Sequence, residues 1–204
     1  MKIGFAIITA PPLFDSIINI QNRLAERYPF HDKLGSRQNL PHTTLFQGTF
    51  KEGFDHRNTA DKIAEQFTEL LPDRTVSFTG AEYRPEGWYF YVMQKTSELQ
   101  QLHETVLELA VPHLDPDPER MNRDLTFLTV DEINGLREYG YRYSGKAFYP
   151  HITIGRTSDD VSTELLAELR SMLKPDTAVI DRVTVYKAGN DGTHAESLYE
   201  AGIK

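Results

Sequence analysis

Two short segments of the chain carry the same pattern, in which proline is followed by histidine, any residue, threonine and an aliphatic residue. The first spans residues 41–45 (PHTTL) and the second spans residues 150–154 (PHITI). Proline suits the first position of a β-strand and biases the residue before it toward extended geometry. The residues after each histidine are good strand formers. The pattern therefore predicts two similar strands, one in each half of the chain.

Alternation along a strand decides which of these side chains point the same way. His42 and Thr44 share one face, and His151 and Thr153 do likewise, with roughly 6–7 Å between the two positions of each pair. The intervening residues take the opposite face. Each copy thus presents an imidazole and a hydroxyl on one side of a sheet, and two such strands facing one cleft would bring four reactive groups together.

Hydrophobic periodicity predicts helices and strands along the rest of the chain. We expect helices over residues 12–28, 56–71, 97–113, 130–138 and 160–173. We expect strands over residues 2–9, 41–50, 74–83, 88–94, 147–156, 177–188 and 194–203. Residues 85–87 (PEG) and 189–192 (GNDG) are typical of turns between strands.

Each motif strand lies between helices, so the order of elements repeats weakly between the two halves. This order favours an α+β fold in which antiparallel-rich sheets form a central cleft and the helices pack outside. The two motif strands would be related by a pseudo-two-fold axis. Because no linker is long or polar enough to divide the chain, we expect a single bilobal domain over residues 1–204.

The composition excludes several classes of function. The net charge of −8 argues against a wide basic surface for duplex DNA. No apolar run approaches the ~18 residues of a membrane helix, and the short apolar N-terminus indicates a strand rather than a signal peptide. The chain has no cysteine, which rules out disulfides, thiolate metal sites and a cysteine nucleophile. We expect a cytoplasmic monomer that binds neither membrane nor duplex DNA.

Basic residues gather beside both motifs within this acidic chain. Residues 137–156 hold four basic residues against one acidic residue, and residues 29–51 hold three against one. One interpretation is ordinary scatter of surface charge. The other is a small pocket for a phosphate, with Arg142, Lys146 and Arg156 as substrate contacts.

Paired His-x-Thr motifs flanked by aliphatic residues, one in each half of a chain of this length, resemble the two-histidine (2H) phosphoesterase superfamily. That group includes bacterial RNA 2′-5′ ligase-like proteins and cyclic nucleotide phosphodiesterases. Residues 150–156 (PHITIGR) match the family closely, whereas residues 46–48 (FQG) stand where the family has a more apolar run. The resemblance implies hydrolysis of a cyclic phosphodiester, such as a 2′,3′-cyclic phosphate, or of a 2′-5′ linkage in a nucleotide or RNA end.

The residue types suit this chemistry. An imidazole with a pKa near ~6.5 can act as general base or general acid at neutral pH. Two imidazoles on opposite sides of the phosphorus allow in-line attack, while threonine hydroxyls can donate to the non-bridging oxygens. We therefore take His42, Thr44, His151 and Thr153 as the catalytic residues, and we expect no metal and no cofactor. Either histidine could be the acid.

Two alternatives stay open beside hydrolysis. One is a non-catalytic module that binds a nucleotide or RNA, and the other is RNA end-joining through the same groups. Residues 140–147 (GYRYSGKA) come close to a phosphate-binding P-loop, but alanine replaces the Ser/Thr that would hold Mg²⁺ and a strand follows instead of a helix. His103, followed by a glutamate on a predicted helix, lacks the second histidine of a zinc protease. His31, His56, His113 and His194 lack ligand-like spacing, and surface positions are their default.

Aromatic residues cluster around residues 83–91 and 139–149, where core packing is the ordinary role. Phe46 would share a face with His42, and Tyr149 would share a face with His151, so either ring could stack on a nucleobase. The span between the motifs is long, and residues 137–147 are expected to border the cleft and contact the substrate beyond the scissile phosphate.

Overall fold

A computed structural model describes residues 1–115, 124–158, 162–189 and 192–203. Within this part of the chain the strands form one antiparallel sheet in the order β1-β2-β5-β4-β3-β6-β7, and β1 also pairs with β6. The strands are β1 (Lys2–Thr9), β2 (Thr43–Thr49), β3 (Thr75–Arg84), β4 (Trp88–Met93), β5 (His151–Arg156), β6 (Asp176–Ala188) and β7 (His194–Gly202).

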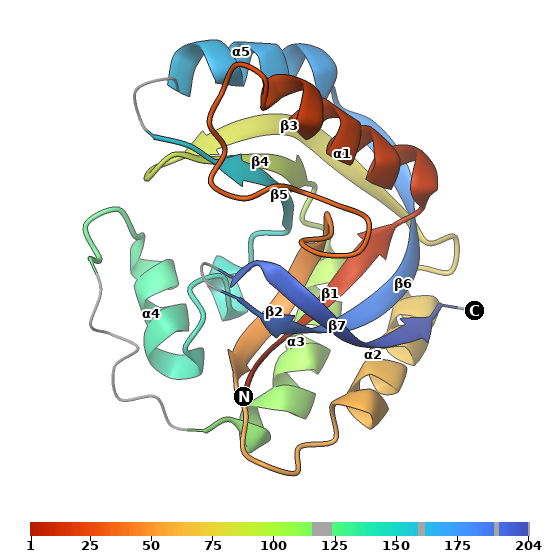
Figure 1. The fold of residues 1–204 in the computed structure, drawn as a ribbon. Coiled ribbons are helices and arrows are strands. Elements are labelled where there is room, and N and C mark those ends of the chain that lie inside the picture. The colour runs from red at the N-terminus through yellow and green to blue at the C-terminus, as the bar shows by residue number, and fades with distance from the viewer. Residues whose placement is uncertain (116–123, 159–161, 190–191, 204) are drawn as a thin grey trace.

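The helices pack against this sheet (Figure 1). They are α1 (Pro11–Leu24), α2 (His56–Leu70), α3 (Ser97–Ala110), α4 (Val130–Tyr139) and α5 (Ser162–Met172). Two short 3₁₀ turns, η1 (Val111–His113) and η2 (Gly145–Ala147), complete the described elements. The α+β class and the antiparallel pairing predicted from the sequence are confirmed.

The sheet has two lobes, and the long strand β6 runs through both of them. Its residues 176–179 pair with β3, whereas its residues from 180 onward pair with β1 and β7. One lobe therefore contains β2, β1, β7 and the second part of β6, and the other contains β5, β4, β3 and the first part of β6. The motif strands β2 and β5 are neighbours where the two lobes meet.

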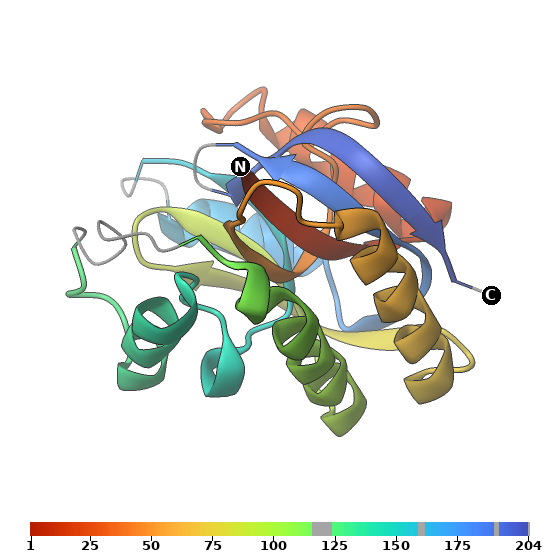
Figure 2. The ribbon, with the colours of Figure 1, turned by 90° about the horizontal axis from the view of Figure 1, so that it is seen from below.

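Each lobe has its own pair of helices. Helices α2 and α3 lie against the lobe of β1, β2 and β7, and α1 and α5 lie over β3 and β5 of the other lobe (Figures 1 and 2). Their buried residues, such as Ile17 of α1, Ile63 of α2 and Leu169 of α5, belong to the main hydrophobic core. The helices thus lie outside the lobes, as expected from the sequence. No helix of the described residues is long and apolar enough to cross a membrane.

Local sequence signals fix the segments that lead into the site. Helix α4 begins with a capping box, in which Thr129 and Glu132 each bond the backbone of the other, and it ends at Gly140 with φ 78°. The turn between β3 and β4 uses Glu86 at φ 71° and Gly87 at φ 83°. A Cβ at Gly87 would lie 1.9 Å from the carbonyl oxygen of Thr157, so only glycine allows this turn to approach the end of β5.

Several boundaries differ from the sequence-based expectation. Helix α1 ends at Leu24 instead of near residue 28, because the next turn tightens to an i−3 bond and Pro29 disfavours helical geometry at the residue before it. The second motif strand begins at His151 instead of near 147, since η2 occupies residues 145–147. Residues 116–123 of the span between the motifs, the start of the helix predicted from 160 and the centre of the turn predicted at 189–192 lie outside the described residues.

Candidate active site

The two motif strands meet at their central residues. Thr43 of β2 pairs with Ile152 of β5, and this antiparallel contact is the register between the two strands. In an antiparallel pair the flanking residues face each other in reversed order. Each motif histidine therefore lies beside the threonine of the other motif, and the pair marks the pseudo-two-fold axis predicted from the sequence.

Both motif histidines are held by the same backbone contact. The Nδ1 of His42 lies 2.7 Å from the carbonyl oxygen of Leu40, and the Nδ1 of His151 lies 2.6 Å from that of Tyr149. A carbonyl oxygen only accepts, so each Nδ1 carries the hydrogen. Each neutral imidazole is left with a lone pair on Nε2, which is the arrangement a general base requires.

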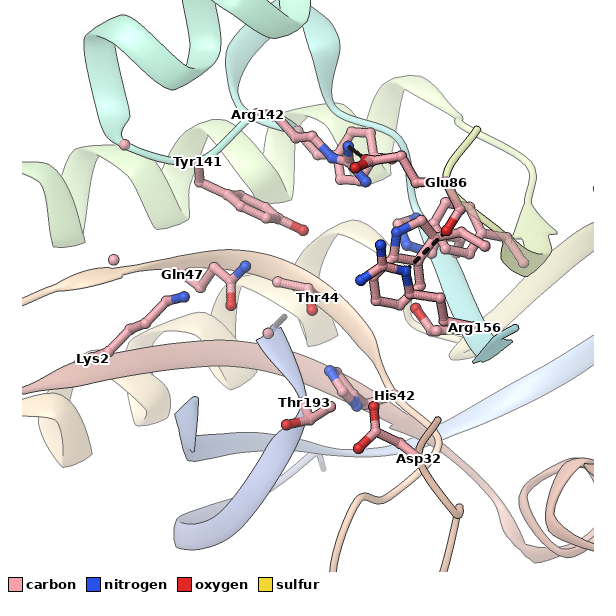
Figure 3. Close-up of a pocket in the computed structure, with 18 of the residues that line it drawn as sticks. Lys2, Asp32, His42, Thr44, Gln47, Glu86, Tyr141, Arg142, Arg156 and Thr193 are labelled. Carbon is pink, nitrogen blue, oxygen red and sulfur yellow. Dashed lines mark hydrogen bonds and ion pairs between the residues drawn. The ribbon is translucent and has the colours of Figure 1, made fainter. Parts of the chain in front are cut away.

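A cavity of about 770 Å³ brings the four motif side chains together, since His42, Thr44, His151 and Thr153 all line it. Figure 3 shows His42 and Thr44 on one side of this space and Arg156 with Arg142 on the other. The described wall of the cavity includes residues 138–143, so the C-terminal part of the segment between the motifs borders it.

Aromatic rings enclose the second histidine. Phe90 stacks on His151 with ring centroids 3.8 Å apart, and the edge of Tyr143 approaches at 5.2 Å. Burial lowers the pKa of His151 to about 3, and the nearby guanidiniums of Arg142 and Arg84 act in the same direction. His151 is therefore neutral in the free protein at physiological pH.

The first histidine lies against a different set of rings. The centroid of Tyr186 is 4.9 Å from that of His42, and the centroid of His194 is 5.6 Å away. Tyr186 and His194 stack on each other at 4.7 Å. Burial lowers the pKa of His42 and brings that of His194 to about 4. His194 is fully buried, which is a correction to the surface position expected from its isolated place in the sequence.

A third buried histidine, His103, connects two segments next to the cavity. The Nδ1 of His103 donates to the carbonyl oxygen of Leu45 at 2.7 Å, and its Nε2 accepts from the amide of Gly145 at 2.8 Å. Phe148 stacks on the ring at 4.2 Å. This imidazole joins β2 to the segment that follows Arg142, and burial lowers its pKa to about 4.

The structure separates the three basic residues predicted to contact substrate. Arg142 and Arg156 line the cavity, whereas Lys146 is exposed and lies outside its lining. Arg142 is 3.9 Å from the Glu86 carboxylate, and Arg156 donates from Nε to the Glu86 carbonyl at 2.9 Å (Figure 3). The guanidinium of Arg156 also lies 5.2 Å from the ring centroid of Trp88, another lining residue.

Phe46 does not share the cavity face with His42, contrary to the expectation from simple alternation. Thr44 pairs with Ala6 and Phe46 pairs with Phe5, so Leu45 is the extra residue of a β-bulge. The bulge shifts the alternation by one residue. Phe46 is fully buried in the core as a result, and Gln47 lines the cavity in its place.

Tyr149 also lies outside the lining of the cavity. Its hydroxyl donates to the carboxylate of Glu82 at 2.5 Å, and the guanidinium of Arg84 lies 5.4 Å from its ring centroid. Arg84 in turn forms an ion pair of 2.7 Å with Glu132 of α4. The ring of Tyr149 lies 5.6 Å from that of His151, and its carbonyl oxygen orients this histidine.

Sequence reasoning missed Tyr186, and it placed Tyr141 near the cleft only as part of residues 137–147. The hydroxyl of Tyr186 lies 3.1 Å from the Thr44 hydroxyl, and Tyr141 points its hydroxyl toward the same threonine (Figure 3). Both positions lie far from Thr44 in the sequence, so no local pattern predicts their contact with it.

The described residues hold no group of three or more His, Asp or Glu side chains placed to bind a metal ion.

A family model described as the 2′-5′ RNA ligase superfamily matches residues 17–192. Among curated proteins, none matches this sequence significantly.

Two solved structures share the fold. TT0787 of Thermus thermophilus is similar with a TM-score of 0.54 and 12% identity, over 100% of this chain and 98% of that chain. LigT of E. coli, in complex with 3′-AMP, is similar with a TM-score of 0.51 and 15% identity, again over 100% of this chain and 98% of that chain.

Proposed function

The chain belongs to the 2′-5′ RNA ligase superfamily, and from this membership we propose that it is a metal-independent phosphoesterase. Its substrate would be a cyclic phosphodiester, such as a 2′,3′-cyclic phosphate, or a 2′-5′ linkage in a nucleotide or RNA end. The reaction would use His42 and His151 as general acid and general base.

The matched orientation of the two histidines is the main support for this proposal. Two imidazoles line one cavity, each fixed through Nδ1 to a backbone carbonyl and each left with a free Nε2 lone pair. One of them can take a proton from water while the other gives a proton to the leaving ester oxygen. Since a bound phosphate anion favours a protonated neighbour, binding of the substrate would raise the pKa of the histidine that acts as the acid.

The remaining polar groups suit a single phosphate. The hydroxyls of Thr44 and Thr153 lie beside the imidazoles and can donate to the non-bridging oxygens as charge develops there. Arg142 and Arg156 supply positive charge to the same cavity. Their guanidiniums suit the planar, bidentate recognition of phosphate oxygens.

A nucleoside on that phosphate fits the aromatic wall of the cavity. LigT of E. coli has been solved with 3′-AMP, which supports a ribonucleotide as the substrate class. With Phe46 buried in the core and Tyr149 outside the cavity lining, we place the base on Trp88, whose ring lines the cavity. Stacking on an aromatic ring contributes ~1–3 kcal/mol per base.

End-joining of RNA is the second candidate, because the family model bears the name of that reaction. It would use the same groups in reverse, with a ribose hydroxyl in place of water. A module that only binds a nucleotide does not need two histidines oriented for proton transfer. The matched Nδ1 contacts of His42 and His151 therefore favour an enzyme.

The test is incubation with 2′,3′-cyclic nucleotides, 2′-5′ dinucleotides and RNA with a 2′,3′-cyclic end, with the products identified by phosphorus NMR. We expect a 2′- or 3′-phosphomonoester to form at the same rate with and without EDTA. Loss of activity in EDTA that returns with Zn²⁺ or Mn²⁺ would replace the proposal with a metallophosphoesterase. Binding without turnover of any ester would favour the nucleotide-binding module.

The cellular setting is part of the same proposal. We place the protein in the cytoplasm, because a chain without cysteine gains nothing from an oxidising compartment. We propose that it acts as a monomer without a cofactor, since one chain supplies both histidines. Gel filtration with light scattering would test the monomer directly.

A further inference from the structure

The ring of Tyr186 crosses a neighbouring strand to reach Thr44. Tyr186 lies on β6 and pairs with Gly4 of β1, whereas Thr44 lies on β2 at the far side of β1. A Cβ at Gly4 would be 2.2 Å from the ring, so the absence of a side chain there opens the path. The phenol hydroxyl ends 3.1 Å from the Thr44 hydroxyl.

The direction of this hydrogen bond follows from burial. Tyr186 is fully buried, and among the described residues Thr44 is the partner of its hydroxyl. If Thr44 donated to the phenol, the phenol hydrogen would be buried without an acceptor, which is costly. Burial raises the pKa of Tyr186 to about 12, so its hydroxyl keeps the hydrogen. Tyr186 therefore donates and Thr44 accepts, which leaves the Thr44 hydrogen for the cavity side, where Tyr141 and a substrate phosphate are the other groups within its reach.

The ring itself has little freedom to move away. His194 stacks on it with an angle of 18° between the planes, and His42 lies at 4.9 Å. Tyr186 thus contacts both functional side chains of the first motif. The second motif lacks a counterpart, because no side chain among the described residues bonds the hydroxyl of Thr153.

We propose that Tyr186 is a positioning residue, which directs the hydroxyl hydrogen of Thr44 into the cavity and toward a non-bridging oxygen of the substrate phosphate. This inference rests on the proposed function of the cavity. A hydroxyl that accepts one hydrogen bond becomes a stronger donor in the next. The contribution should grow as charge develops on the phosphate oxygens, so it belongs to the transition state more than to substrate binding.

The first experiment is a double-mutant cycle with a 2′,3′-cyclic nucleotide as substrate. Tyr186→Phe should lower kcat about tenfold with little change in KM, which is less than the ~10²–10³-fold cost of losing a donor that itself touches the reacting group. In a Thr44→Val background the same change should have no further effect, whereas in a Thr153→Val background it should keep its full effect.

The matched control is Tyr91→Phe. Tyr91 is also buried and donates to a backbone carbonyl, that of Lys174 at 2.7 Å, but it lies outside the cavity. Both variants remove one buried phenol oxygen, so Tyr91→Phe shows the effect of that loss on the fold alone. Equal kcat in the two variants, or a Tyr186→Phe effect that persists in the Thr44→Val background, would overturn the proposal.

A second measurement does not depend on which ester the protein cleaves. Neutron diffraction from a crystal exchanged into D₂O locates hydroxyl deuterium atoms. We expect the Tyr186 deuterium between the two oxygens and the Thr44 deuterium directed into the cavity. A Thr44 deuterium aimed at the phenol would overturn the inference, even for a protein active on cyclic phosphates. If both deuterium atoms lie where we expect them but the protein cleaves none of the tested esters, the hydrogen bond is confirmed and the proposed function is wrong.

Discussion

Leu45 and Ile154 hold the same place in the two motif strands, because each is the extra residue of a β-bulge three positions after its histidine. A bulge re-aims the residues that follow it. The residues five positions after the histidines, Gln47 and Arg156, therefore line the cavity together with the motif threonines. The backbone symmetry of the two motifs thus extends beyond His-x-Thr, whereas the positive charge at the fifth position lies on the second motif alone.

The first prediction concerns the two histidines. We expect His42→Ala and His151→Ala each to lower kcat by ~10²–10⁴-fold, because each removes one proton-transfer group. The double variant should lose little more than either single one, since the two groups act as a unit. His56→Ala, at the start of α2 and outside the cavity, is the control. Near wild-type turnover in either single variant would exclude the two-histidine mechanism.

The second prediction concerns the threonine hydroxyls. Thr44→Val and Thr153→Val keep the β-branched shape and remove one donor, so we expect kcat to fall ~10²–10³-fold while the fold is kept. Thr43→Val is the matched control on the same strand, because this buried hydroxyl has no hydrogen bond partner among the described residues. It should keep full activity and equal or greater stability. Steady-state kinetics and thermal unfolding separate the two effects.

The third prediction separates two basic residues of one segment. Arg142 lines the cavity with 22% of its side chain exposed, whereas Lys146 lies outside the lining. Arg142→Ala should raise KM for a nucleotide more than it lowers kcat, because a ground-state contact with the phosphate is lost. Lys146→Ala removes the same charge from the same segment and should leave both constants unchanged. An equal rise in KM in both variants would indicate a general electrostatic effect.

Much of the site could be predicted from the sequence, because its core is local. The family match confirms the resemblance drawn from the paired motifs. Alternation along a strand predicts each histidine on the same face as its own threonine, and all four side chains line one cavity. Of the basic residues near the second motif, Arg142 and Arg156 line it as well. All of these depend on residues within a few positions of each other.

The features of the site that the sequence did not predict depend on contacts between strands that are distant in the sequence. Phe46 was misplaced because a bulge against β1 shifts the alternation, and a bulge depends on the partner strand as much as on the strand itself. Tyr186 reaches Thr44 only because β6 and β2 flank β1 at Gly4, with 142 positions between the two residues along the chain. His194 is buried because its ring stacks on that same tyrosine.

The fourth prediction is that the free energy of unfolding falls as the pH drops below about 6.5. Burial lowers the pKa of His103 and His194 to about 4 and that of His151 to about 3 in the folded protein. Between these values and ~6.5 the unfolded chain binds protons that the folded chain does not, which favours unfolding by up to ~1.4 kcal/mol per pH unit for each histidine. Stability from these groups is therefore complete above ~6.5 and lost toward pH 4.

Urea unfolding at a series of pH values measures this slope. Carboxylates also lose favourable contacts in acid, so the decisive comparison is with His103→Asn. This variant should be less stable at pH 7, where the bond to Gly145 is lost, yet its stability should fall less steeply between pH 6.5 and 4. An unchanged slope would mean that His103 titrates normally in the folded protein.

The last prediction is that the two lobes unfold together, as expected for a single domain. Strand β6 pairs with β3 through residues 176–179 and with β1 from residue 180 onward, so neither lobe keeps a complete sheet without the other. Trp88, the only tryptophan, lies on β4 in the lobe covered by α1 and α5 and reports on that lobe by fluorescence. Ile63→Val removes one methyl group from the buried face of α2 in the opposite lobe, at a cost of ~0.5–1.5 kcal/mol. We expect the Trp88 transition to shift down by about 2–4 °C, in step with the loss of helical circular dichroism. A Trp88 midpoint that stays in place while the helical signal shifts would show that the lobes are independent domains.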